Sequence, residues 1–297
     1  MLKDKKPGTK RRELKYVHRI AWLFGIPYLV ATIIFGWYPI GTALVVAFQK
    51  FSVIRPCTFV GLDNFKYFID DPTIYQSFRN TFYYAALSIG ITFMIPIFIA
   101  ILLMEMKKNI IRVMMILWFI PVASMAGIII WKWFYNTQYG LFNGVLVSLN
   151  LPELGWLEDS KLAMICLVLP GLIMYGPGLI YIATIQGIPE ELYEAAHLEG
   201  AGFFQKIWHI TLPRIRPIIA MMLLLSIIGN LQVFDQPYVM TGGGPNFATY
   251  SVVMYLFDIA FQEMRFGRAT ALSLLLFVVI MVFVILQRKY FKENPDI

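Results

Sequence analysis

Long apolar runs separated by short polar segments make up most of this chain. A helix needs about 20 such residues to cross a hydrocarbon core of about 30 Å, and backbone in lipid must satisfy its own hydrogen bonds. None of the runs alternates in polarity as a barrel strand does. The pattern therefore predicts an all-α membrane protein with six transmembrane helices. The six runs lie at about 20–48, 80–104, 111–134, 162–187, 215–236 and 269–287.

Composition and charge agree with a multi-pass membrane protein. The 297 residues are 59% hydrophobic and 14% charged, with a mean hydropathy of +0.67, far more apolar than a soluble domain. Most of the 25 Lys and Arg residues fall before residue 20, at 105–112, at 206–216 and after 287. Because cytoplasmic loops carry the excess of positive charge, we expect both termini to be cytoplasmic. The net charge of +7 reflects topology and lipid headgroups, and we expect no nucleic-acid partner.

The polar segment between the fourth and fifth runs reads EELYEAAHLEGAGFFQKIWHITLP, at 190–213. Pro189 and the glutamates after it favour a helix start, since proline suits the first turn and carboxylates face the positive end of the helix dipole. Gly200 and Gly202 predict its end after about 11 residues. An amphipathic stretch then leads into the fifth run. A solvated loop or a helix lying on the headgroups fits these features as well.

The spacing of residues in this segment resembles the EAA loop of ATP-binding-cassette (ABC) importer permeases. The positions that match are Glu194, Ala195, Ala196, Gly200, Ile210, Leu212 and Pro213. Two further stretches, FVGLDNFKYFIDDPTIYQSFRNT at 59–81 and YVMTGGGPNFATYSVVMYLFDIAFQEMRFGRATALS at 238–273, resemble the maltose-type carbohydrate permeases. The resemblance covers nearly the whole chain after residue 20. It departs from the best-known member, which has extra N-terminal spans and a large extracytoplasmic insertion.

The resemblance implies a type I ABC importer permease fold and a subunit that imports a carbohydrate: a mono- or oligosaccharide, or a polyol phosphate. It implies a second permease subunit, two ATPase subunits, an extracytoplasmic solute-binding protein, and the inner membrane of a bacterium or archaeon. The EAA loop would dock on an ATPase subunit. No phosphate-binding Gly-x4-Gly-Lys-Ser/Thr motif occurs, so we expect no cofactor on this chain, with ATP and Mg on the partner ATPase.

The expected organisation is a basic cytoplasmic tail at 1–19, a six-span domain at 20–288 with the EAA coupling loop at 188–214, and a cytoplasmic tail at 289–297. An enzyme is not expected, because the three histidines lie in the tail and the loop, and no catalytic motif is present. Cys57 and Cys166 are too few for a metal site, so none is expected. The remaining alternative is a stand-alone secondary transporter of a small polar solute.

Polar side chains inside a span are the default candidates for a solute pathway. The fifth run offers Asn230, Gln232 and Asp235, with Tyr238 after them. At 1.5 Å per residue from Arg216, Asn230 lies about 21 Å into the membrane and Asp235 about 28 Å, where Asp235 serves equally well as an interfacial cap. In the fourth run, Gly176, Pro177 and Gly178 interrupt helical bonding and predict a hinge, although such residues are common in membrane helices.

Overall fold

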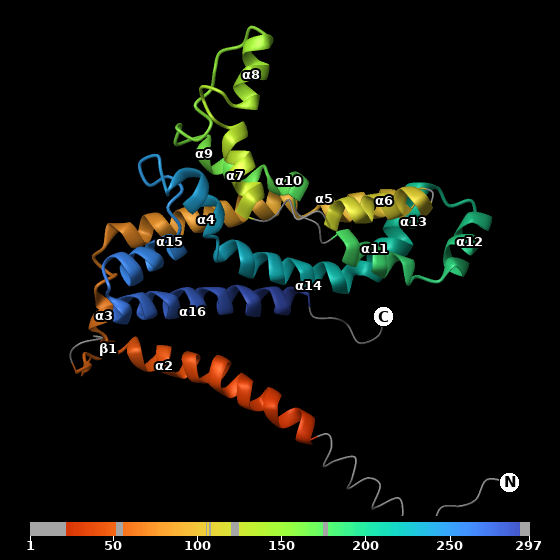
Figure 1. Cartoon of the computed structure of the whole chain (residues 1–297). Coiled ribbons are helices and arrows are strands. Elements are labelled where there is room, and N and C mark those ends of the chain that lie inside the picture. The colour runs from red at the N-terminus through yellow and green to blue at the C-terminus, as the bar shows by residue number, and fades with distance from the viewer. Residues whose placement is uncertain are drawn as a thin grey trace, which may run out of the picture.

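Helices form nearly all of the regular structure in the computed structural model of the chain (Figure 1). The structure describes residues 22–51, 56–104, 106, 108–119, 125–174 and 178–291. The first half contains η1 (Ile33–Trp37), α2 (Tyr38–Val46), β1 (Gln49–Lys50), β2 (Thr58–Phe59), α3 (Asp63–Lys66), α4 (Pro72–Thr92), α5 (Ile95–Met104), α6 (Lys108–Phe119), α7 (Met125–Phe134) and α8 (Leu141–Ser148). The second half contains α9 (Ala163–Val168), α10 (Gly171–Met174), α11 (Gly178–Gln186), α12 (Glu190–Leu198), α13 (Phe203–Lys206), η2 (Ile207–Thr211), α14 (Leu212–Leu231), η3 (Pro237–Thr241), α15 (Val252–Phe257), η4 (Asp258–Gln262) and α16 (Phe266–Tyr290).

Four helices in the described part of the chain are long and apolar enough to cross a membrane: Trp22–Val46, Pro72–Met104, Phe203–Leu231 and Phe266–Tyr290. They correspond to the first, second, fifth and sixth predicted runs. The third run carries α6 and α7, and the fourth carries α9, α10 and α11, which are shorter. Residues 120–124 and 175–177, between these pieces, lie outside the described residues. The all-α membrane class is confirmed, and the count of six spans stays a prediction.

The second long helix begins eight residues before its apolar run, because local capping rather than hydropathy sets its start. Asp71 accepts a hydrogen bond from the Thr73 N–H at 2.9 Å, and Pro72 occupies the first turn. Both features stabilise a helix N-terminus. Hydropathy marks the apolar stretch of a membrane helix and misses its polar lead-in.

The predicted end of the fifth run at residue 236 is wrong, since α14 ends at Leu231. Helical structure starts again at η3, where Pro237 lies in the first turn, and Pro237 has no N–H to donate to the carbonyl of Val233. The Ser251 hydroxyl donates to that carbonyl instead, at 2.8 Å. Asp235 therefore does not extend the α14 helix, and its depth counted along a continuous helix does not hold.

Apolar clusters hold the long helices together. One joins α15 and α16 to the end of α14 and includes Leu231, Ile259 and Leu272. Another joins α5, α11 and α14 through Ile97, Tyr181 and Ile215. Within a membrane such clusters stabilise the bundle through close van der Waals packing, because lipid tails are as apolar as the side chains. These contacts place α12 at one end of the molecule and α3, β1 and α15 at the opposite end (Figure 1).

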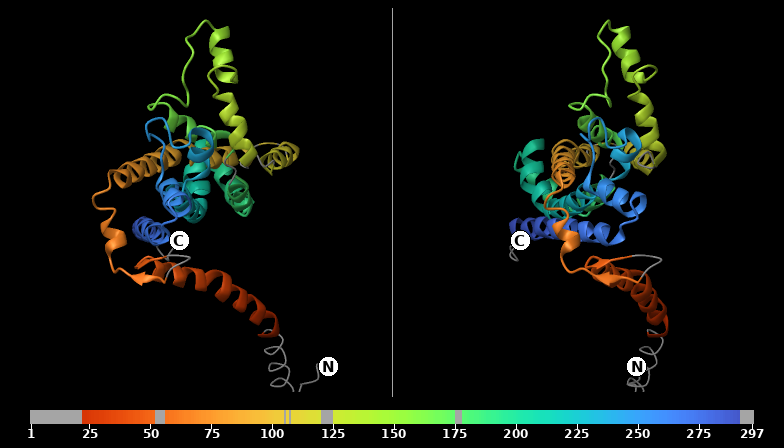
Figure 2. Two further views of the ribbon diagram at one scale, coloured as in Figure 1. Left: turned by 60° about the vertical axis from the view of Figure 1, so that its left-hand side comes forward. Right: turned by 90° about the vertical axis from the view of Figure 1, so that its left-hand side faces the viewer.

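The first long helix, Trp22–Val46, leaves the bundle and curves away from α16 (Figures 1 and 2). None of its apolar window is buried. Its C-terminal end is fixed, because the Asn64 amide donates to the carbonyls of Ala47 (2.8 Å) and Gln49 (3.0 Å). This apolar helix is thus anchored at its C-terminal end, and the chain buries none of its apolar window.

Candidate functional site

The segment that resembles the EAA loop folds into a short helix, a tight turn and a second helix. Pro189 precedes α12 with extended backbone (φ −57°, ψ 130°), and Glu190 and Glu191 occupy its first turn. The helix has nine residues, two fewer than predicted, and none of them is buried. Glu194, Ala195 and Ala196 lie in the middle of α12, where the first two are exposed. The predicted helix is confirmed, with its surface turned away from the chain's own core.

Gly200 ends α12 through its left-handed backbone, with φ +81°. The Gly200 N–H donates to the His197 carbonyl at 3.0 Å, and the Ala201 N–H donates to the Ala196 carbonyl at 2.8 Å. This pair of bonds is the Schellman motif, in which glycine is favoured because a Cβ strains a left-handed residue. No atom lies within 4 Å of a Cβ built at Gly200. The requirement for glycine is therefore conformational, not steric crowding.

The second helix of the element runs without a break into the fifth apolar run. Gly202 precedes α13, and its N–H donates to the Gln205 side chain at 2.8 Å. One π-helical turn, η2, follows, closed by a bond from the Leu212 N–H to the Ile207 carbonyl. Ile207 and Leu212 pack on the cluster of α5, α11 and α14. Ile210 is half-buried and Pro213 is exposed at the start of α14.

A side-chain hydrogen bond fastens α12 to the helix that follows it. The Tyr193 hydroxyl lies 2.9 Å from Oγ1 of Thr211, whose side chain is 4% exposed. Thr211 lies directly before α14. The bond joins α12 to the base of a membrane-length helix. Neither residue belongs to the EAA spacing, so the motif alone did not single them out.

An exposed apolar surface accompanies this element. We call it the α12–α13 surface: Leu198, Phe204 and Trp208, whose side chains are 88%, 81% and 71% exposed. It belongs to the end of the molecule that carries α12 and α13 (Figure 1). Contiguous exposed apolar side chains with a polar rim mark protein or membrane contact sites. The geometry fits a docking surface fixed to a membrane helix.

The structure does not gather the predicted pathway residues into one cavity. Asn230 is 8% exposed and donates to the carbonyl (2.8 Å) and hydroxyl (3.0 Å) of Ser226 on its own helix. Gln232 and Asp235 are exposed after the end of α14. Tyr238 stacks on Phe234 with ring centroids 4.8 Å apart. A pathway role for these four residues stays a prediction.

The predicted hinge lies mostly outside the described residues. Gly178 is buried at the first residue of α11, while Gly176 and Pro177 fall in the part that is not described. The hinge also stays a prediction.

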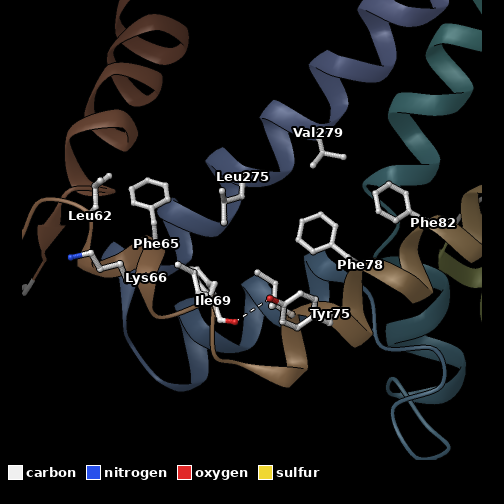
Figure 3. A pocket seen from close by; sticks show the side chains of 11 residues that line it. Leu62, Phe65, Lys66, Ile69, Tyr75, Phe78, Phe82, Leu275 and Val279 are labelled. Atoms are coloured by element: carbon white, nitrogen blue, oxygen red, sulfur yellow. Dashed lines mark hydrogen bonds between the residues drawn. The ribbon is translucent and has the colours of Figure 1, made fainter.

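A hollow of about 610 Å³ lies between α3, α4 and α16 and is lined mainly by apolar side chains (Figure 3). Phe65, Phe78 and Leu275 line it from these three elements. Tyr75 adds a hydroxyl, which donates to the Ile69 carbonyl at 3.1 Å. A hydroxyl-rich solute needs several polar partners, so this hollow does not suit one.

Comparison with known proteins identifies the fold and the family. The family described as "Binding-protein-dependent transport system inner membrane component" matches residues 77–292. The chain belongs to this family. The assignment to the permease family is thus confirmed, the role of the EAA-like residues stays a prediction, and the stand-alone transporter loses its support.

Individual relatives of this permease match over almost their whole length. The trehalose/maltose transport system permease protein MalF of Thermococcus litoralis is 31% identical over 291 residues, covering 96% of this chain and 98% of that protein. The arabinooligosaccharides transport system permease protein AraP of Bacillus subtilis is 30% identical over 280 residues, covering 91% and 88%. A chain in the crystal structure of a bacterial alginate ABC transporter, in complex with an alginate pentasaccharide-bound periplasmic protein, superposes with a TM-score of 0.80 at 23% identity, covering 93% and 95%.

Proposed function

We propose that this permease is the membrane subunit of an ABC importer that carries a carbohydrate and couples ATP hydrolysis on a partner to alternating access. The observation that carries the proposal is the direct attachment of α12 to α14. An exposed apolar surface at 198–208 is joined to a membrane-length helix by the η2 turn and by the Tyr193–Thr211 hydrogen bond. An ATPase bound to this surface would thus be connected directly to a helix of the membrane domain.

The ATPase partner docks on the α12–α13 surface. Leu198 and Phe204 supply apolar contact area, and the shallow face at Ala195 allows a close approach. ATP and Mg bind to the ATPase subunits, of which two serve the complex. When they close on nucleotide, α12 moves with them, and α14 follows because Thr211 holds the two together. A ligand or partner shifts such a conformational equilibrium only through its different affinity for the two states.

A second permease subunit completes the membrane domain. The support for it is the first long helix, Trp22–Val46, whose apolar window has no cover from this chain. An apolar helix that leaves its own bundle suits a partner bundle in the same membrane. We take the assembly to be a heterodimer of related permeases with six spans in this chain, and with both termini in the cytoplasm as the Lys and Arg distribution indicates.

The substrate class follows from the relatives. Their names specify trehalose or maltose and arabinooligosaccharides, and the structural neighbour carries alginate and was solved with a periplasmic protein. We therefore assign a carbohydrate to this chain, delivered by an extracytoplasmic solute-binding protein. Asn230, Gln232, Asp235 and Tyr238 remain our candidates for the pathway, with Gly176, Pro177 and Gly178 as the hinge.

Co-purification from native membranes in mild detergent tests the proposal. We expect tagged wild-type chain to bring down an ATPase subunit and a second permease. Leu198→Asp with Phe204→Asp removes the apolar surface and should lose the ATPase while retaining the second permease. Phe59→Asp is the matched control, since Phe59 is 76% exposed at the opposite end of the molecule. Recovery of the wild-type chain alone, with uptake that needs no ATP, would establish a stand-alone carrier instead.

A further inference from the structure

A second, polar pocket lies at the end of the molecule opposite α12. It has a volume of about 450 Å³ and forms where the start of α4, the segment before α9 and the loop after η3 meet. Its lining includes Gln76, Arg79, Tyr83, Ser160 and Asn246. Volumes of roughly 300–1,000 Å³ are usual for small-molecule sites. The pocket is large enough for a sugar unit.

Arg79 is the charged side chain of this pocket, and no carboxylate is part of the lining. Within the described residues, Arg79 makes no ion pair or hydrogen bond. Other cations at the same end have partners: Arg265 lies 3.3 Å from Glu263, and Arg268 lies 3.8 Å from the centre of the Tyr67 ring. A guanidinium presents a planar fork of donors that matches an anionic group. Arg79 is thus available to pair with an anion that enters the pocket.

The walls around Arg79 are fixed by hydrogen bonds. The Asn80 amide donates to the carbonyls of Phe247 (2.6 Å) and Tyr250 (3.0 Å), and it accepts from the Gln76 amide at 3.3 Å. The Val252 N–H donates to the Thr81 hydroxyl at 3.0 Å. These bonds join α4 to the loop after η3 across more than 160 residues of sequence. A preorganised wall lowers the entropy cost of binding.

Uncharged polar groups surround the guanidinium. The hydroxyls of Tyr83 and Ser160 and the side-chain amide of Asn246 make no hydrogen bond to other described residues. Tyr83 also presents a ring that is 48% exposed. Hydroxyl and amide groups can bind sugar hydroxyls, while an aromatic ring packs on the apolar C–H face of a sugar.

We infer that this pocket binds an acidic saccharide, a sugar that carries a carboxylate, sulfonate or phosphate group, with Arg79 pairing its anion. The inference rests on the proposed function, which makes the solute a carbohydrate and puts this end of the chain outside the cytoplasm. An acidic side chain of the docking solute-binding protein is the competing occupant. The sugar is favoured, because a lone carboxylate leaves the groups of Tyr83, Ser160 and Asn246 without a role.

Saturation-transfer-difference NMR tests the inference on the full-length chain in nanodiscs, together with any subunits that co-purify with it. The probes are methyl β-glucuronide, glucose 6-phosphate, methyl β-glucoside and inorganic phosphate. We expect the two acidic sugars to bind at least tenfold more tightly than the neutral glucoside. Arg79→Gln should remove this preference, and Arg79→Lys should retain part of it because the charge stays while the fork is lost. Lys66→Gln is the matched control, an exposed cation at the same end that pairs with Asp63 at 3.6 Å.

Each outcome of the NMR measurement either supports or contradicts the acidic-saccharide site. A preference for acidic sugars that disappears in Arg79→Gln and persists in Lys66→Gln supports the inference. Equal binding in wild type and Arg79→Gln overturns it, as does displacement of the glucuronide by an equal concentration of inorganic phosphate, which would mark a plain anion site. If Arg79→Gln weakens only the stimulation of ATPase activity by the binding protein, Arg79 is a docking contact and the inference is wrong.

Failure of the proposed function gives a different pattern from failure of this inference. The NMR measurement needs neither ATP nor uptake. Loss of the ATPase partner in co-purification therefore contradicts the importer without touching the binding result. Conversely, a normal ATP-driven uptake with no binding at Arg79 leaves the importer intact and removes only the acidic-sugar site.

Discussion

The Tyr193 hydroxyl lies 2.9 Å from Oγ1 of Thr211, so a side chain of α12 is bonded to the residue that precedes α14. The two residues are 18 apart in sequence and stand on opposite sides of the Gly200 turn. Thr211 also approaches the Lys206 carbonyl, at 3.5 Å. A side-chain contact therefore joins α12 to α14, in addition to the backbone of the turn.

Tyr193→Phe should uncouple ATP hydrolysis from transport. The ring stays in place, while the buried Thr211 hydroxyl loses its better partner, at a cost of about 1 kcal/mol. We expect the ATPase to remain bound and the amount of sugar imported per ATP to fall severalfold. The measurement is paired uptake and ATPase assays in proteoliposomes.

Thr211→Val provides the second arm of this test. If the two hydroxyls act through each other, the double variant should lose no more coupling than either single one. A Tyr193→Phe transporter with the wild-type ratio of sugar to ATP would show that the backbone alone carries the motion.

Gly200→Ala should destabilise the turn, because a Cβ strains a residue at φ +81° by about 1 kcal/mol. We expect reduced uptake with the protein still present in the membrane. Gly144→Ala is the matched control: its added Cβ also meets open space, but its φ is not in the left-handed range. Gly200→Asn should recover much of the activity, since asparagine tolerates this conformation. Normal uptake by Gly200→Ala together with Gly200→Val would contradict the requirement for the Schellman turn.

The parts of the fold that depend on neighbours in sequence were predictable. Four apolar runs became membrane-length helices, and Gly200 ends α12 because the Schellman motif involves only six consecutive residues. Helix ends were less accurate. Asp71 and Pro72 start α4 by local capping, and α14 ends at Leu231, before the predicted end of the fifth run.

The parts that depend on distant segments were not predictable from one sequence. Asn80 meets the carbonyls of Phe247 and Tyr250 across 167 and 170 residues. Arg79, next to it, looked like any exposed arginine until the fold placed Ser160 and Asn246 in the same pocket. The pathway residues stay a prediction for a related reason: polarity within a span shows that a side chain needs partners, and Ser226 supplies them for Asn230.

Asn80→Ala should destabilise the end of the molecule opposite α12. It removes the side-chain donor from the carbonyls of Phe247 and Tyr250, although the Phe247 carbonyl still accepts from the Tyr250 N–H at 3.3 Å. The expected cost is about 1–3 kcal/mol. We expect a lower midpoint of thermal unfolding in detergent, measured by tryptophan fluorescence. Asn109→Ala, at an exposed position in the first turn of α6, should leave the midpoint unchanged. Equal midpoints for the two variants would mean that the loop after η3 is held by other contacts.

Alkaline pH should lower the stability of the end of the molecule opposite α12, because Tyr250 and Tyr255 ionise there. Burial raises the pKa of both phenols well above the ordinary value of 10.0, and hydrogen bonds to Asp258 and Asp71 raise it further. A raised folded pKa gives stability that is complete below pH 10 and is lost as the pH rises above it, because the unfolded chain ionises first.

Absorbance near 295 nm follows the ionisation of the tyrosines and checks the raised pKa values. The midpoint of thermal unfolding, measured at each pH, checks the loss of stability. Tyr255→Phe keeps the ring and removes the titrating group, so its stability should depend less steeply on pH above 10 than that of the wild type. Tyr75→Phe is the control, since Tyr75 is 64% exposed and bonds a carbonyl in place of a carboxylate. If Tyr255→Phe loses stability with pH as steeply as the wild type, the contact with Asp71 does not hold the phenol protonated.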